Sequence, residues 1–298
     1  MTTLGTATTQ ALMPLVESEK ILLMFPYTGD DNLRNEKYKH LIHFRPSYLD
    51  EISALVRFSQ EKLMGQKYGV FYTDEPFGRE RYEYLKKQLI DTYRMTADQV
   101  CPIPYPRGTI NVDTAIPELK SCNPDVLVLL STFDAARALV QGVGVANLKN
   151  TNLMGYSYLT DLFQDFAGKG RDGHSGKGLH FTITRLIPDP RTATLEIVKD
   201  YRREMELIYP GSRFDVDSLE GYVNASILID MIAHIPEPIT LDKIIANAEQ
   251  MHAYDFQGLQ LNFDPITREL SRQVWVDPSH GDWIPMSDGQ EVSAQKNK

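Results

Sequence analysis

The sequence predicts an α/β fold built around a mainly parallel sheet, and three observations support this. Short apolar runs alternate with segments of helical periodicity along most of the chain. Several of these runs are continuously apolar, which is typical of strands buried on both faces. The chain has 298 residues, which is enough for two domains of about 150 residues each.

The alternation begins near the N-terminus. The apolar run Ile21-Leu22-Leu23-Met24-Phe25 ends at Pro26, as expected for a buried strand. Ile52, Leu55 and Val56 have helical spacing in a segment that ends before Gly65. In order, we expect helix 8–18, strand 21–25, strand 41–45, helix 48–64, strand 67–72, helix 79–93 and strand 125–130.

The same rhythm continues to about residue 211 and then changes. We expect helix 135–143, a strand edge at 152–155, helix 158–167, strand 178–184 and helix 193–207. Two long helices at 216–235 and 241–251 follow, and then a hairpin-like β region formed by 259–263 and 272–276. The tail after Gly289 is polar, so residues 289–298 are expected to be disordered.

Composition excludes several classes of function. The net charge is −9, with 31 basic and 40 acidic residues, which argues against nucleic acid as a partner because phosphate binding needs clustered Lys and Arg. Apolar runs stay well short of the roughly 18 residues of a membrane span. The chain as given starts without the basic and apolar regions of a secretory signal.

Sequence motifs give no sign of catalysis. Phosphate-binding glycine loops, nucleophile elbows and metalloprotease helices are absent, and the seven histidines are scattered. Cys101 and Cys122 lack the spacing of a zinc site; a disulfide and two buried free thiols are both compatible with the sequence. We therefore expect no enzyme activity, no metal and no cofactor.

Hydroxyl and aromatic residues gather at the carboxyl ends of the predicted strands, where open α/β sheets bind ligands. Hydroxyls and backbone amides there can hold a carboxylate, and aromatic rings can cover the apolar remainder of a small ligand. The sequence thus predicts a binding site for a small polar molecule. Its candidates are Thr6, Thr8, Tyr27, Thr28, Gly29, Phe77, Ser131, Thr132, Phe133, Tyr156, Ser157 and Tyr158.

The chain resembles a known family from residue 1 to about residue 286. Ser218-Leu219-Glu220-Gly221-Tyr222-Val223-Asn224-Ala225 is similar to a Gly-Tyr-x-Ala helix start in the leucine/isoleucine/valine-binding family of type I periplasmic binding proteins. The order of the surrounding segments is similar as well: the strand ending at Pro26, the loop 72–78, Met154-Gly155 and the strand at Gly178.

The resemblance implies two doubly wound lobes joined by a three-strand hinge, with a small solute bound in the cleft between them. Lobe 1 is expected at 1–44 and 212–265, and lobe 2 at 45–211 and 266–288. Closure of the lobes around the solute is the family's mechanism. The implied partners are the solute and the membrane subunits of an ABC transporter, and the implied location of a full-length form is the periplasm.

The resemblance also implies roles for individual residues. Thr6 matches a serine that binds the ligand's carboxylate, and Tyr27–Gly29 matches a turn that holds carboxylate and ammonium groups. In lobe 2, Phe77 matches an aromatic residue, and Thr132 or Phe133 falls near another; Tyr156 joins them from the strand-end set.

Lys177 departs from the family pattern. It falls where amino-acid binders have a glutamate that pairs with the ligand's ammonium, and a lysine would repel that group. This favours an anionic or neutral polar solute. The alternative is that Lys177 points to solvent and another acid, such as Asp74, takes the role.

Two other classes of function compete with solute transport. The first is a ligand-sensing domain on the same fold, in which lobe closure regulates a partner. A fused effector domain upstream would support sensing, and an in-frame signal peptide would support transport. The second is a doubly wound enzyme, which would need a nucleophile–base pair or metal cluster.

The family's first strand-helix-strand unit has no counterpart in this sequence, so we expect lobe 1 to be truncated. Leu12, Leu22 and Met24 would then lie in an incompletely covered core. Melting followed by circular dichroism tests this expectation. A single cooperative transition at high temperature, together with tight ligand binding, would contradict it.

Overall fold

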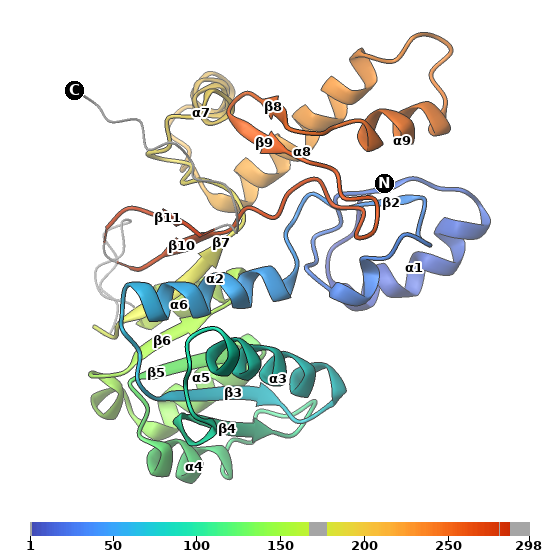
Figure 1. Cartoon of the computed structure of the whole chain (residues 1–298). Helices are drawn as coiled ribbons and strands as arrows, with labels where there is room; N and C mark the ends of the chain where they lie inside the picture. The colour runs from blue at the N-terminus through green and yellow to red at the C-terminus, as the bar shows by residue number, and fades with distance from the viewer. Residues whose placement is uncertain (1, 167–177, 280, 287–298) are drawn as a thin grey trace. The chain divides into compact units, whose positions relative to one another are not determined.

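The computed structural model describes residues 2–166, 178–279 and 281–286 (Figure 1). The chain divides into two compact units, and the chain passes between them three times. Unit 1 comprises Met1–Tyr48 and Leu186–Gln273, and unit 2 comprises Leu49–Arg185 and Val274–Lys298.

Unit 2 is organised around a seven-stranded sheet with the order β11-β10-β7-β6-β5-β3-β4. The strands are β3 (Tyr68–Thr73), β4 (Val100–Tyr105), β5 (Val126–Leu130), β6 (Asn152–Gly155), β7 (Phe181–Arg185), β10 (Trp275–Asp277) and β11 (Ile284–Pro285). The run from β4 to β7 is parallel, and β10 and β11 continue the sheet in antiparallel pairing. The predicted mainly parallel sheet is confirmed.

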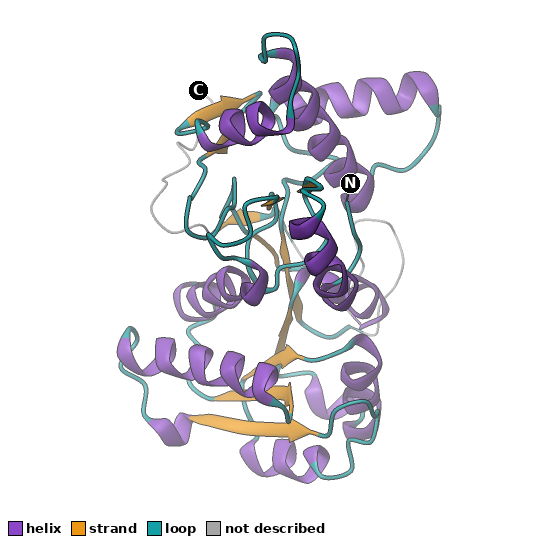
Figure 2. Ribbon diagram, turned by 90° about the vertical axis from the view of Figure 1, so that its right-hand side faces the viewer, coloured by secondary structure: helices purple, strands orange, loops and turns teal. Residues whose placement is uncertain are grey.

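Helices cover both faces of this sheet (Figure 2). They are α2 (Tyr48–Glu61), α3 (Pro76–Asp91), α4 (Ala115–Cys122), α5 (Phe133–Val143) and α6 (Thr160–Phe166), with 3-10 turns at Ala97–Gln99, Val145–Leu148 and Ser157–Leu159. One core cluster joins alternate strand residues such as Phe71 and Leu129 to Leu139 of α5 and Phe166 of α6. This alternation follows from the two-residue period of a strand.

The described strands of unit 1 form two separate two-stranded sheets, β1 (Leu23–Met24) with β2 (Leu41–Ile42) and β8 (Tyr254–Phe256) with β9 (Leu259–Leu261). Its other elements are α1 (Thr6–Ser18), α7 (Glu196–Ile208), α8 (Val216–Ala233), α9 (Leu241–Glu249) and a 3-10 turn at Asp31–Leu33. β1 and β2 pair in parallel, and Leu4 makes a parallel bridge to Tyr27. Of the three residues expected in an incompletely covered core, Met24 is buried, whereas Leu12 and Leu22 are half-buried.

The expected hairpin of 259–263 with 272–276 is wrong. β9 pairs instead with β8, while β10 joins the sheet of unit 2. Gln257 and Gly258 both have positive φ, at 52° and 94°, and make the two-residue turn that favours a tight hairpin. This local turn determines the pairing of β9.

The boundaries of the units differ from those expected for the lobes. Residues 186–211 lie in unit 1 because α7 packs on the start of α8, where the Tyr201 hydroxyl bonds to that of Ser218. Residues 266–273 also lie in unit 1, where Arg268 O accepts from His43 N at 2.9 Å.

Strand β4 and helix α4 were not predicted. Pro102 and Pro104 lie within β4, and proline normally argues against a strand. β4 is at the edge of the sheet, where a proline does not interrupt a second ladder of hydrogen bonds.

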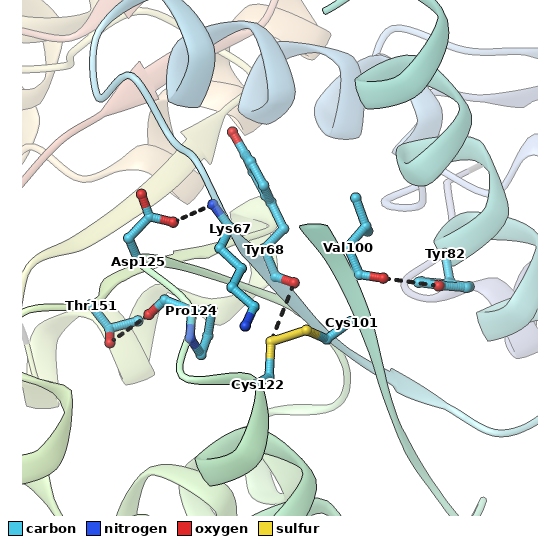
Figure 3. Close-up of a disulfide and its surroundings, with 9 residues drawn as sticks. All are labelled: Lys67, Tyr68, Tyr82, Val100, Cys101, Cys122, Pro124, Asp125 and Thr151. Carbon is cyan, nitrogen blue, oxygen red and sulfur yellow. Dashed lines mark hydrogen bonds between the residues drawn. A yellow bond between two sulfur atoms is a disulfide. The ribbon is translucent and has the colours of Figure 1, made fainter. Parts of the chain in front are cut away.

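A disulfide joins these two elements (Figure 3). Cys101 on β4 and Cys122 at the end of α4 have Cα atoms 6.2 Å apart and are separated by 21 residues. Of the two alternatives that the sequence left open, the structure therefore has the disulfide.

We expect the double variant Cys101→Ser/Cys122→Ser to lose about 3 kcal/mol of unfolding free energy, because the cross-link restricts the unfolded chain. Chemical denaturation with and without a thiol reductant measures this. The reductant should lower the denaturation midpoint of the unaltered protein and leave that of the double variant unchanged. Equal denaturation midpoints for the two oxidised proteins would contradict the expectation.

Candidate functional site

The turn Tyr27–Gly29 of unit 1 lies beside the N-terminus of α1. Tyr27 N donates to Thr3 O at 2.8 Å, and Gly5 N donates to Tyr27 O at 3.1 Å. These two bonds place the turn next to Thr6, the first residue of α1. The structure thus brings together the candidates Thr6, Tyr27, Thr28 and Gly29.

Thr6 and Thr28 are joined by their hydroxyls, whose oxygens lie 2.7 Å apart. Thr28 Oγ1 also accepts from Asp30 N at 3.2 Å. The two threonines have two hydroxyl protons between them, and their mutual bond uses one. The pair can therefore donate the other to a bound group.

The first turn of α1 adds backbone donors to this pair. The first amides of a helix have no acceptor within the helix, and the N-cap residue, Gly5, has no side chain to bond to them. The helix dipole makes this end favourable for negative charge. Together with the threonine hydroxyls, these amides can hold a carboxylate.

Gly29 is required by a close approach of the chain. Tyr48 N donates to Gly29 O at 2.7 Å, and a Cβ on Gly29 would lie 2.9 Å from Cδ1 of the Tyr48 ring. A larger residue would push the turn away from Tyr48.

The side chain of Tyr27 is held by charged residues that were not predicted as part of the site. Its hydroxyl donates to Asp217 Oδ1 at 2.9 Å, and the Arg45 guanidinium carbon lies 3.3 Å from the centroid of its ring. Burial raises the pKa of Tyr27 to about 12; Arg45 opposes this increase and Asp217 adds to it.

Arg45 is fixed by a buried bidentate ion pair. Its Nε and Nη2 donate to Glu220 Oε1 and Oε2 at 2.5 and 2.8 Å. Arg34 Nη2 donates to Arg45 O at 2.7 Å, and Arg34 Nη1 pairs with Glu269 at 2.6 Å. The signal in the sequence was a Glu between Leu219 and Val223 on the apolar face of a helix.

His43 is fully buried next to this group. Its Nε2 lies 3.2 Å from Leu33 O. Burial, with the nearby Arg34 charge, lowers the pKa of His43 well below its usual value. His43 is therefore a neutral core residue.

In unit 2, tyrosine hydroxyls connect the carboxyl ends of neighbouring strands. Tyr105 Oη accepts from Thr73 Oγ1 at 3.1 Å and from Thr132 N at 3.2 Å. The hydroxyl of Tyr158 donates to Ser131 O at 3.0 Å. Thr132, the N-cap of α5, is exposed at this edge, and Phe133 begins the helix half-buried.

The segment after β6 is held by Glu51, a buried carboxylate on α2. Glu51 accepts from Ser157 N at 2.9 Å, from Ser157 Oγ at 3.3 Å and from the hydroxyl of Thr184. The ring of Tyr156 is buried, and its centroid lies 5.3 Å from that of Tyr158. The bond from Tyr158 to Ser131 thus places candidates from the ends of β5 and β6 next to each other.

Phe77, in the first turn of α3, lies under a buried arginine. The Arg81 guanidinium carbon is 3.0 Å from the centroid of the Phe77 ring, and Arg81 Nη1 donates to Phe77 O at 3.1 Å. Phe77 itself is half-buried.

Lys177 and Asp74 are the two residues that the sequence suggested for recognition of a charged solute. Lys177 lies outside the described residues. Asp74 forms an exposed ion pair with Arg79 at 2.7 Å, and the hydrogen bond from Arg79 lowers the pKa of Asp74. The Asp74 carboxylate thus already has a cationic partner.

Other kinds of site have no support in the described part of the chain. Within it, no cluster of three or more His, Cys, Asp or Glu side chains could bind a metal ion. Its helices also include none with the length and apolar character needed to span a bilayer.

Comparison with known families shows the class of the protein. Residues 1–276 match the family model for periplasmic binding proteins, so the chain belongs to the periplasmic binding protein family. Proteins of this family bind solutes and are not enzymes. No curated protein sequence matches the chain.

Solved structures show the same type I α/β fold. A possible leucine/isoleucine/valine-binding protein from Rhodopirellula baltica SH 1 has a TM-score of 0.75 at 22% identity, covering 95% of this chain and 76% of the other. A fatty acid ABC transporter substrate-binding protein from Thermomonospora curvata has a TM-score of 0.71 at 18% identity, and the match covers 98% of this chain and 74% of the other. An ABC transporter solute-binding protein from R. palustris in complex with benzoate has a TM-score of 0.69 at 13% identity, and the match covers 96% of this chain and 76% of the other.

Removal of one partner of the buried Arg45–Glu220 pair should destabilise the protein strongly. We expect Glu220→Gln to cost about 3 kcal/mol of unfolding free energy, because the Arg45 charge stays buried without its carboxylate. Glu61→Gln is the matched control: it breaks the Arg57–Glu61 pair, which is 39% and 43% exposed, and should cost less than about 1 kcal/mol. Similar midpoints for both variants in urea denaturation would show that the buried pair has no special role.

Proposed function

We propose that the chain is a solute-binding protein of an ABC transporter and that it binds a small polar solute carrying a carboxylate or amide. The observation that carries the proposal is the Thr6–Thr28 hydroxyl pair at the N-terminus of α1. Hydroxyl and amide donors converge there beside a turn whose backbone is fixed by Gly29. Such an arrangement binds an anionic or acceptor group without reacting with it.

The names of similar proteins support a carboxylate in particular. Leucine, isoleucine, valine, fatty acids and benzoate, which are named for these relatives, share a carboxylate and differ in the rest of the molecule. Backbone amides and threonine hydroxyls can bind this shared carboxylate whatever the rest of the solute is. The remainder would then determine which solute is bound.

For that remainder we propose the aromatic and hydroxyl candidates of unit 2. Phe77, Phe133 and Tyr156 would supply apolar surface, and Thr132 a hydroxyl, with Lys177 as a further candidate. The bonds through Tyr105 and Glu51 support this proposal because they fix the segments that carry these side chains.

The disulfide supports a periplasmic location. Structural disulfides persist in oxidising compartments, of which the bacterial periplasm is one, and are rare in the cytosol. The Cys101–Cys122 bond therefore fits delivery of a solute to membrane subunits from the periplasmic side.

A thermal-shift screen with amino acids, amides, short carboxylates and aromatic acids tests this function. We expect a bound solute to raise the melting temperature by mass action. Thr6→Val should weaken binding of the best carboxylate by about tenfold, since it removes a hydrogen bond to a charged group, and Thr6→Ser should restore it.

The control is Thr114→Val, which changes an exposed N-cap threonine of α4 in unit 2. If Thr6→Val and Thr114→Val bind the same carboxylate equally well, the Thr6–Thr28 pair is not the binding site.

A further inference from the structure

The Tyr27 ring has a fixed orientation, because charged groups hold both its face and its hydroxyl. Arg45 lies against the ring face, and Asp217 accepts the hydroxyl proton. Glu220 fixes the guanidinium of Arg45 with both of its carboxylate oxygens. Asp217 and Glu220 are three residues apart at the start of α8 and thus lie on one side of the helix.

The hydrogen bond to Asp217 decides what the Tyr27 hydroxyl can offer a solute. A phenol has one proton, and here Asp217 Oδ1 accepts it. With a pKa of about 12, Tyr27 keeps that proton at neutral pH. Its oxygen can then only accept. Asp217 is exposed, and its carboxylate likewise only accepts.

The neighbouring edge of the same turn has the opposite character. Thr28, the next residue, shares with Thr6 a hydroxyl proton that can be donated, and the α1 amides are donors as well. Thr28 is fully buried, so the pair offers its donor through the half-buried Thr6, whereas Tyr27 offers an acceptor.

Helix capping does not account for Asp217. The N-cap of α8 is Asp215, whose Oδ1 accepts from Ser218 N at 2.8 Å. An acid in the first turn also stabilises a helix through its dipole, as Asp242 does in α9, but this role does not require a bond to a tyrosine.

We propose that Asp217 is a specificity-determining residue: by accepting the Tyr27 hydroxyl proton, it makes this edge of the turn select a solute with a hydrogen-bond donor. The inference rests on the proposed function and narrows it. The solute class becomes small carboxylates that also carry an N–H or O–H group, such as amino or hydroxy acids. Fatty acids and plain aromatic acids would be disfavoured.

Calorimetric titration of the full chain with matched probes tests this. The pairs are L-leucine with 4-methylpentanoate and L-phenylalanine with 3-phenylpropanoate, whose members differ only in the ammonium donor. We expect the unaltered protein to prefer the amino acid in at least one pair. Asp217→Asn should reduce that preference about tenfold, because the Asn amide can donate to the Tyr27 oxygen and release its proton toward the solute.

Tyr27→Phe should reduce the preference by a similar factor, and the double variant should lose little more, since both changes remove one interaction. The ratio within a pair is the readout, because a merely structural defect weakens both members alike. Asp242→Asn, an exposed acid in the first turn of α9, is the matched control and should leave the ratio unchanged.

The outcomes separate the two proposals. If carboxylates bind and Asp217→Asn leaves the ratio unchanged, or if the unaltered protein prefers the member without a donor, the inference about Asp217 is overturned while the carboxylate site stands. If none of these probes and no carboxylate of the thermal-shift screen binds to the unaltered protein, the carboxylate site itself is wrong and the inference falls with it.

Discussion

The structure of unit 1 depends on the buried ion pair between Arg45 and Glu220. These residues are 175 positions apart in the sequence, and their contact joins the chain after β2 to the first turns of α8. Burial of two charges is costly, and the attraction compensates only when the geometry is complete and further hydrogen bonds are made. The bidentate contact and the bond from Arg34 to Arg45 O meet this condition. The pair thus favours one arrangement of the N-terminal and C-terminal segments over looser ones.

The same pair also orients a side chain of the candidate site. Arg45 lies against Tyr27, so the carboxylate of Glu220 also fixes, through the guanidinium, a ring in the candidate turn. Unit 2 uses a different device, in which neutral tyrosine hydroxyls join strand ends and the buried Glu51 holds the segment after β6. In both units, candidate side chains are oriented by hydrogen bonds or ion pairs to neighbouring residues. Such support reduces the conformational entropy that a site loses on binding.

The sequence predicted the parts of the fold that depend on local periodicity. β3, β5 and β6, and most of the helices, lie where the apolar runs and helical spacing indicated. The prediction missed β4, because Pro102 and Pro104 argued against a strand there. It was also wrong about the pairing of β9, because the tight turn at Gln257 and Gly258 pairs β9 with β8. In the site, strand ends and resemblance indicated Thr6 and the 27–29 turn. Arg45, Asp217 and Glu220 could not be found in this way. Their roles come from contacts between residues 175 and 190 positions apart in the sequence, which local periodicity does not reveal.

A shared fold therefore leaves the choice of solute open. The α1 amides and the Gly29 turn are backbone features, and a backbone site for a carboxylate survives large changes in sequence. This fits relatives at 22% identity or less whose names range from branched amino acids to fatty acids and benzoate. Discrimination must then come from side chains next to the common site. In the site that we propose, Tyr27 is such a side chain, and Asp217 accepts its hydroxyl proton. Discrimination by hydrogen bonding is stronger than discrimination by size, because a solute without the matching group leaves a desolvated polar atom unpaired.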